Sequence, residues 1–315
     1  MGTTPNRPRS YGEGMSLQDV AENIWKLTIV EMLPVAESFG SDVLLFDADD
    51  GRRYAIKNSF SPSTGQREID ALTALASHTH VPNLIDHQTI DGEMYLLIEG
   101  LDGTPWSSIK GTSEEFLKSV GVAIGNVHQV PFGTFDGCTT WHGLLQHNAD
   151  RYQGNIGADD ESLAVHARAA LDIHMNEIPD STDPVLVQFD LRPGNILTKD
   201  GDFVALIDFE SARGGHPSMD FFKFWHQVQP LIPTVLDTIM AGYTKAHEYK
   251  AASSDLDRSW MTPESLHRLM TIYSLYHGLA GLSWCYTRDD FSGNFPGTNR
   301  ELISSAIRHL GSERT

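Results

Sequence analysis

Residues 186–210, LVQFDLRPGNILTKDGDFVALIDFE, place Asp190, Asn195 and Asp208 around two short apolar runs. The runs ILT and FVALI predict two strands, and the KDGD between them predicts a tight turn. This turn folds the strands back, so Asn195 and Asp208 are expected at one end of the hairpin, next to the loop that carries Asp190. A bare hairpin needs none of these side chains. Two of them offer the oxygen ligands that Mg²⁺ prefers, and a third carboxylate can accept a proton from a hydroxyl.

The composition is that of a folded protein with one large domain or two lobes. The 315 residues are 40% hydrophobic and 21% charged, as in soluble globular proteins. Apolar runs stay well below the ~18 residues of a membrane span, and the N-terminus lacks the apolar core of a secretion signal. Only two cysteines, Cys138 and Cys285, are present, which favours a reducing cytoplasm. The net charge of −19 argues against nucleic acids and anionic membranes as partners.

The order of predicted elements changes near residue 100. Residues 1–15 read as a mobile tail, and Ser16 with Asp19 forms a predicted capping box for a helix through Trp25. Three strands, a helix and two more strands are expected over residues 27–100, with hairpin turns at residues 49–51 and 91–92. Beyond this point the pattern is mostly helical. We therefore expect a β-rich N-lobe over residues 16–100 and a mainly helical C-lobe over residues 101–315.

The opening stretch has the parts that phosphoryl transfer requires: an Asp base, an Asn and a second Asp for Mg²⁺. FDLRPGNIL followed by LIDFE resembles the catalytic and metal loops of the aminoglycoside phosphotransferase and choline kinase family. The resemblance covers about residues 25–230, and it implies an α+β, protein-kinase-like bilobal fold. It also implies that Asp190 is the catalytic base, that Asn195 and Asp208 bind magnesium, and that Asp220 is a buried brace for the catalytic loop.

The upstream sequence supplies the other parts of such a site in the required order. Lys57 lies on the third predicted strand and Glu68 on the next helix, where a kinase pairs a phosphate-binding lysine with a glutamate. AESFGSDVLLF takes the place of the phosphate-covering loop, and LLIEGLDG resembles the hinge that meets the nucleotide base through backbone atoms. The implied nucleotide-binding positions are Ser38, Gly40, Ser41, Lys57, Glu68, Glu99 and Leu101.

Two positions in the catalytic loop depart from the family pattern. Gln188 stands where His is usual, and Phe189 stands where Gly or Asn is common. The Gln188 amide can replace the hydrogen bonds of an imidazole, so we expect it to be buried and bonded to the backbone near Asp190 or Asp208. The candidate substrate contacts are Arg192, Glu210, Trp284, Asp289 and Asp290.

The resemblance implies ATP- or GTP-dependent, Mg²⁺-assisted phosphorylation of a hydroxyl on a small molecule. The expected acceptor is an antibiotic or another aminated natural product, and no obligate protein partner is evident. Two alternatives stay open: a metabolic kinase for choline, homoserine or a sugar, and a pseudokinase that binds nucleotide without turnover. A eukaryotic-type protein kinase is disfavoured because His-Arg-Asp, Asp-Phe-Gly and Ala-Pro-Glu are missing from the sequence.

Overall fold

The computed structural model describes residues 15–35, 41–59, 61–107, 109, 111–248 and 259–312. Contacts divide the chain into an N-terminal unit, Met1–Thr73 with Pro82–Leu101, and a C-terminal unit, Ala74–Val81 with Asp102–Thr315. Residues 74–81, which the sequence assigned to the N-lobe, belong to the second unit. There the backbone of His80 accepts a hydrogen bond from Leu206 at 2.9 Å, so this segment is tied to the hairpin of residues 196–206.

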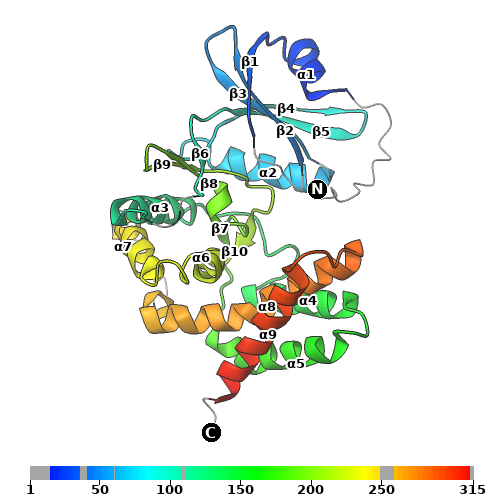
Figure 1. Ribbon diagram of the computed structural model, residues 1–315, viewed down its shortest axis with the longest axis vertical. Coiled ribbons are helices and arrows are strands. Elements are labelled where there is room, and N and C mark those ends of the chain that lie inside the picture. Colours follow the sequence, from blue (N-terminus) through cyan, green and yellow to red (C-terminus); the bar gives the residue numbers. More distant parts are fainter. Residues whose placement is uncertain are drawn as a thin grey trace. The chain divides into compact units, whose positions relative to one another are not determined.

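The N-terminal unit is built on a five-stranded antiparallel sheet (Figure 1). The sheet order is β1-β2-β3-β5-β4, and hairpins join β2 to β3 and β4 to β5, as predicted. Left-handed backbone at Gly51 and at Asp91 with Gly92 makes the two turns tight. The strands are β1 Ile29–Leu33, β2 Ser41–Ala48, β3 Arg53–Ser59, β4 Leu84–Ile90 and β5 Glu93–Glu99.

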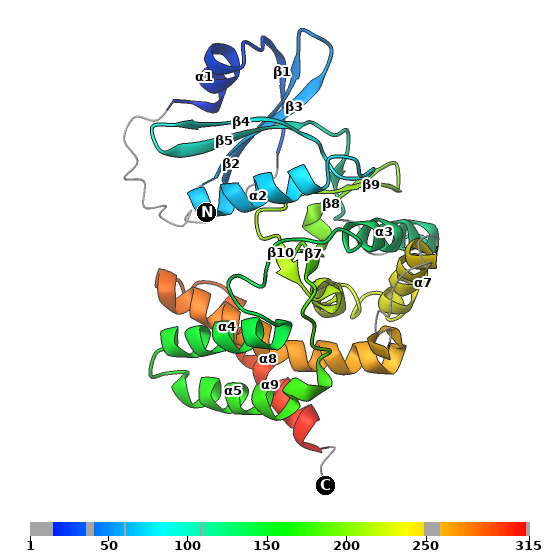
Figure 2. The same ribbon diagram turned by 180° about the vertical axis from the view of Figure 1, so that it is seen from behind.

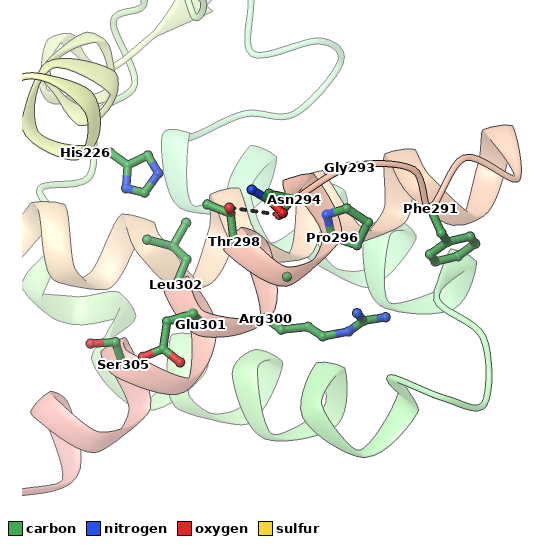
Figure 3. A pocket seen from close by; sticks show the side chains of 11 residues that line it. His226, Phe291, Gly293, Asn294, Pro296, Thr298, Arg300, Glu301, Leu302 and Ser305 are labelled. Carbon is green, nitrogen blue, oxygen red and sulfur yellow. Dashed lines mark hydrogen bonds between the residues drawn. The ribbon is translucent and has the colours of Figure 1, made fainter. Parts of the chain in front are cut away.

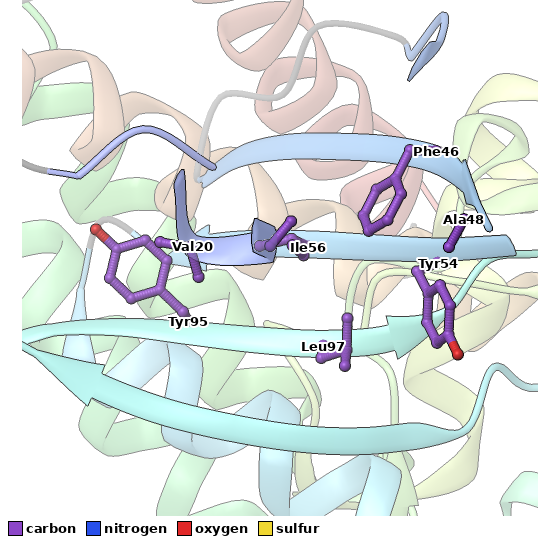
Figure 4. Close-up of a cluster of buried hydrophobic side chains, with 8 residues drawn as sticks. Val20, Phe46, Ala48, Tyr54, Ile56, Tyr95 and Leu97 are labelled. Atoms are coloured by element: carbon purple, nitrogen blue, oxygen red, sulfur yellow. The ribbon is translucent and has the colours of Figure 1, made fainter. Parts of the chain in front are cut away.

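Alternating side chains give this sheet two different faces. Phe46, Ile56 and Leu97 share one face and pack with Val20 in a buried apolar cluster (Figure 4). The cluster is covered by α1, Leu17–Asp19, which continues as a π-helix over Val20–Ile24. The predicted Ser16 capping box is present, so the start of this helix is confirmed. The opposite face carries Lys57 and meets α2, Pro62–Ala74.

The C-terminal unit contains the hairpin that the opening stretch predicts. β8, Ile196–Lys199, pairs with β9, Asp202–Leu206, and Asp200 and Gly201 turn the chain with positive φ angles. A short strand, β6 Thr104–Pro105, extends this sheet, and β7 Val185–Val187 pairs with β10 Arg213–Gly215. The 3-10 turn Pro193–Asn195 leads directly into β8. The predicted catalytic loop therefore connects β7 to β8, and the predicted metal loop connects β9 to β10.

Helices make up most of this unit (Figure 2). α3 packs against α7, and Gly121 and Gly242 let the two backbones approach too closely for a Cβ atom at either position. α8 packs against α4, α5 and α9. None of the helices that the structure describes is long and apolar enough to cross a membrane. The helices are α3 Glu114–Val127, α4 Trp141–Asn155, α5 Glu161–His174, α6 Phe221–Gln227, α7 Val235–Glu248, α8 Pro263–Arg288 and α9 Phe295–Ser312.

Candidate active site

A buried ion pair lies in the N-terminal unit. The Lys57 ammonium is 2.8 Å from the Glu68 carboxylate, and the two side chains are 8% and 3% exposed. Lys57 stands on the central strand, opposite Val43 of β2 and Leu96 of β5. Desolvating two charges makes such a pair a poor source of stability. The pairing of Lys57 with a glutamate on α2 matches the arrangement predicted for a phosphate-binding lysine.

The other predicted nucleotide contacts fall at the edges of the sheet. Ser38 and Gly40 lie outside the described residues, whereas Ser41 is buried at the start of β2. Glu99 ends β5, and its carboxylate accepts hydrogen bonds from the side chain and backbone of Asn83, at 2.7 and 3.2 Å. This leaves the Glu99 side chain with a structural role, which agrees with a hinge that uses backbone atoms. Leu101 follows directly and is half-buried.

The buried carboxylate of Asp220 binds the backbone of the catalytic loop. Asp220 is 3% exposed, and its carboxylate accepts hydrogen bonds from the backbone amides of Gln188 at 2.8 Å and Phe189 at 2.7 Å. His128 of α3 lies 3.0 Å from the same carboxylate, and its other ring nitrogen is 3.2 Å from the Tyr243 hydroxyl. The predicted brace is confirmed. It fixes the backbone just before Asp190.

Asp190 follows this brace and is held through both carboxylate oxygens. The Asn195 amide donates to Oδ2 at 3.1 Å and to the Asp190 carbonyl at 2.8 Å. Arg192 Nε is 3.2 Å from Oδ2. The Lys223 ammonium of α6 contacts Oδ1. The carboxylate thus keeps one orientation, with a cationic side chain at each oxygen.

Asn195 and Asp208 come together at one end of the β8–β9 hairpin, as the sequence predicts. Asn195 immediately precedes β8, and its carbonyl accepts a hydrogen bond from the amide of Ile207 at 2.9 Å. Asn195 uses its side-chain nitrogen on Asp190, so its side-chain oxygen is the atom that can face a cation. An amide oxygen beside a carboxylate is a suitable donor set for Mg²⁺. The residues present therefore fit a magnesium ion.

Gln188 connects the catalytic and metal loops. It is 1% exposed, and its side-chain amide donates to the carbonyl of Ile207 at 2.5 Å and to that of Asp208 at 3.1 Å. The expected buried position and backbone bonding are confirmed. The Gln188 departure therefore keeps the hydrogen-bond donor that the loops need.

Comparison with known proteins decides the family. Residues 31–253 match the model of the phosphotransferase enzyme family, described by the name APH. The chain belongs to this phosphotransferase family. No curated protein sequence matches the chain.

Solved structures of several small-molecule kinases are similar in fold to this chain. A ternary complex of a thermostable aminoglycoside phosphotransferase APH(4)-Ia mutant with AMP-PNP and hygromycin B is 17% identical, with TM-score 0.69, covering 94% of this chain and 98% of that one. Macrolide 2'-phosphotransferase MphH from Brachybacterium faecium is 18% identical, with TM-score 0.62, covering 90% and 96%. A putative fructosamine-3-kinase from Thermobifida fusca is 19% identical, with TM-score 0.62, covering 93% and 100%. These likenesses establish the protein-kinase-like fold.

The Phe189 departure has a structural explanation in this phosphotransferase. Its φ angle is 64°, a left-handed conformation that Gly and Asn adopt more easily than Phe. The Phe189 ring contacts Trp141 edge to face at 6.0 Å, and the Arg213 guanidinium lies 4.6 Å from the ring centre. Aromatic and cation–π contacts of this kind are each worth about 0.5–1.5 kcal/mol. They offset the backbone strain at Phe189.

The candidate substrate contacts of the phosphotransferase separate into two places. Arg192 is part of the Asp190 cluster, and Glu210 follows the metal loop and is half-buried. Trp284, Asp289 and Asp290 lie at the end of α8. There the Trp284 ring contacts Phe295 at 5.5 Å, and Asp289 caps the helix with a φ angle of 50°. Hydrogen bonds from Ser292 hold the Asp290 carboxylate and lower its pKa.

A pocket of about 810 Å³ opens between α6, the turn after α8 and α9. Figure 3 shows His226 of α6 at one end of the pocket and Phe291 at the other. Its charged lining residues are Arg300 and Glu301, and Arg300 is paired with Asp160 at 2.7 Å. His226 and Lys223 are three residues apart on α6, so their side chains are neighbours on one helix face. Helix α6 thus carries both a residue that lines the pocket and the lysine that contacts Asp190.

Lys223 is a residue of this site that was not predicted from the sequence. Its ion pair joins residues 33 positions apart, which no local pattern reveals. One signal was available: Lys223 is the single acid or base in the run FFKFW. Burying an ammonium group among aromatic side chains is costly. A lysine in such a run is therefore expected to place its ammonium group in solvent or against an anionic partner.

Proposed function

We propose that this protein transfers the γ-phosphoryl group of ATP or GTP to a hydroxyl of a small molecule, with Mg²⁺ as cofactor. The observation that carries the proposal is the two-sided support of Asp190 by Asn195 and Lys223. A general base has to lie within hydrogen-bond reach of the proton that it abstracts, so a carboxylate held in one orientation is suited to this role. The buried Lys57–Glu68 pair supports the nucleotide-binding part of the proposal.

The residues of the chain have separate tasks in this reaction. Asp190 accepts the proton of the acceptor hydroxyl as the hydroxyl oxygen attacks the γ-phosphorus. The new oxygen–phosphorus bond forms while the bond to the β-phosphate oxygen breaks, and the nucleoside diphosphate leaves. Lys57 contacts phosphate oxygens. Asn195 and Asp208 would hold Mg²⁺, which would offset the negative charge of the phosphate oxygens.

We assign the acceptor to the pocket of His226 and Phe291. Its volume of about 810 Å³ lies within the ~300–1,000 Å³ of sites for drug-sized ligands, which supports a natural product such as an antibiotic. Among the described residues, Glu301 is the only acidic side chain that lines it. A polycation would need more carboxylates than this to replace its hydration. We therefore favour an acceptor with at most one positive charge over a highly cationic aminoglycoside.

The cellular setting follows the sequence analysis. Cys138 and Cys285 are both free thiols, which supports the proposed cytoplasmic location. The charge of −19 supports a small-molecule acceptor over nucleic acid.

The decisive experiment measures nucleoside diphosphate release from purified protein with ATP or GTP and Mg²⁺. The acceptor panel contains a macrolide, hygromycin B, choline, homoserine and a fructosamine, with water alone as the baseline. We expect release above baseline with a weakly charged natural product, loss of release with EDTA, and loss in the Asp190→Asn variant. Preferred turnover of choline, homoserine or the fructosamine would replace the natural-product assignment by a metabolic kinase. No nucleotide turnover under any condition would leave the pseudokinase alternative.

A further inference from the structure

Lys223 reaches the catalytic base from outside the catalytic loop. It stands on α6, 33 residues after Asp190, and its ammonium contacts carboxylate oxygen Oδ1. The loop's own residues, Asn195 and Arg192, both bind the other oxygen, Oδ2. The position of Oδ1 is therefore set by Lys223 of α6. A carboxylate oxygen has about two lone-pair sites, so one ammonium on Oδ1 leaves room for an acceptor hydroxyl.

The surroundings of Lys223 give its ammonium no other acidic partner among the described residues. Its helix neighbours Phe221, Phe222 and Phe224 are buried. The titratable groups near it are His226 on α6 and His277 on α8, and neither offers a negative charge. Burial lowers the pKa of Lys223 to about 8. The contact with the Asp190 carboxylate is therefore what holds the ammonium in place.

The same face of α6 leads to the acceptor pocket. His226 lines the pocket about one helical turn after Lys223. The Cβ atoms of residues three apart on a helix are about 5–6 Å from each other. The position of α6 thus sets both the edge of the pocket and the orientation of the base. A substrate bound against α6 would therefore be placed by the same helix that orients the Asp190 carboxylate.

We propose that Lys223 is a positioning residue for phosphoryl transfer, which aims the Asp190 carboxylate at a hydroxyl entering from the His226 side of the pocket. This inference rests on the proposed function. Lys223 acts through Asp190 and takes no proton from the acceptor. Misplacing a reacting group by ~1 Å can lower a rate about 100-fold, so loss of this contact should act on kcat.

The test compares Lys223→Met, which removes the charge, with Lys223→Arg, which keeps it. Lys118→Met is the matched control, because Lys118 forms an exposed ion pair with Glu114 on α3. Nucleoside diphosphate release is measured with MgATP and the best acceptor of the panel, and with water as the acceptor. We expect Lys223→Met to lower kcat about 10–100-fold while the KM for MgATP stays within about twofold of the wild-type value. Lys223→Arg should recover most of kcat, and Lys118→Met should match the wild type.

A double-mutant cycle separates positioning from a structural role. If Lys223 acts through Asp190, adding Lys223→Met to Asp190→Asn should lower kcat no further, because the group that it aims is already disabled. Independent, multiplicative losses would overturn the inference, as would wild-type kcat in Lys223→Met. Absence of turnover in the wild-type protein, with every acceptor and with water, would instead remove the proposed function and this inference together.

Discussion

Gln188 and Ile207 are joined by a short hydrogen bond, in which the Gln188 side-chain amide donates to the Ile207 carbonyl at 2.5 Å. The same amide lies 3.1 Å from the carbonyl of Asp208. One side chain thus ties the loop that carries Asp190 to the loop that carries Asp208. A histidine at this position would donate a ring N–H in the same way. The usual residue and Gln188 therefore do the same structural work, and neither needs a charge to do it.

The first prediction concerns this contact. Gln188→Ala leaves buried carbonyl oxygens without a donor, so it should lower the free energy of unfolding by about 1–3 kcal/mol. Gln188→His keeps a donor and should retain stability and activity. Urea unfolding of both variants provides the measurement, with Gln146→Ala on the exposed face of α4 as control. An unchanged midpoint in Gln188→Ala would show that the hydrogen bond contributes nothing.

The second prediction concerns the base. Asp190→Asn keeps the shape of the side chain but removes its ability to accept a proton. Turnover should fall about 10²–10⁴-fold, the usual contribution of general-base catalysis. Nucleotide affinity, measured by calorimetry, should stay near the wild-type value. Near-normal turnover would remove Asp190 from this role.

The third prediction concerns the metal. Asp208→Ala should abolish transfer and weaken binding of MgATP, because the proposed Mg²⁺ would lose a carboxylate ligand. Binding measured with and without Mg²⁺ should show that the variant has lost the benefit of the ion. Asp202→Ala is the control, since Asp202 is exposed at the start of β9. Equal Mg²⁺ dependence in Asp208→Ala and the wild type would refute the assignment.

The fourth prediction isolates backbone strain at Phe189. Phe189→Ala and Phe189→Gly both remove the ring, but only Gly accepts a φ angle of 64° without steric cost. The Gly variant should therefore be about 1 kcal/mol more stable than the Ala variant, as measured by urea unfolding. At Ala241, an exposed position within α7, the change to Gly should have the opposite sign. A less stable Gly variant at position 189 would mean that the strain is not significant.

Local signals were sufficient for the elements that build the site. Asp-Gly turns set the hairpins at residues 49–51 and 91–92, and Asp200 with Gly201 sets the turn between β8 and β9. Because that turn fixes which strand ends meet, the proximity of Asn195 and Asp208 was predictable from the sequence.

Other features depend on contacts between elements that are distant in the sequence, so no local sequence pattern predicts them. The Lys223–Asp190 contact joins separate elements, and the pocket forms only where α6 meets the α8–α9 turn. The helix through Trp25 was predicted, but its change to π-geometry over Val20–Ile24 was not. Phe189 looked like a simple departure until its positive φ angle showed why small residues are usual there.

The last prediction concerns stability against pH. Arg268, and to a lesser extent His174, lower the pKa of Glu177 from 4.5 to about 2 through hydrogen bonds and charge. A carboxylate whose folded-state pKa is lowered stabilises the fold above its unfolded value and loses that effect as the pH falls. Wild type should therefore be more stable than Glu177→Gln at pH 7, with the difference disappearing between about pH 4.5 and pH 2. Since Glu177 is 40% exposed, the effect should be modest and should weaken with salt. Urea unfolding across this range measures it, with the exposed Glu115→Gln as control. A pH-independent difference between wild type and Glu177→Gln would mean that packing, not charge, accounts for the contribution of Glu177.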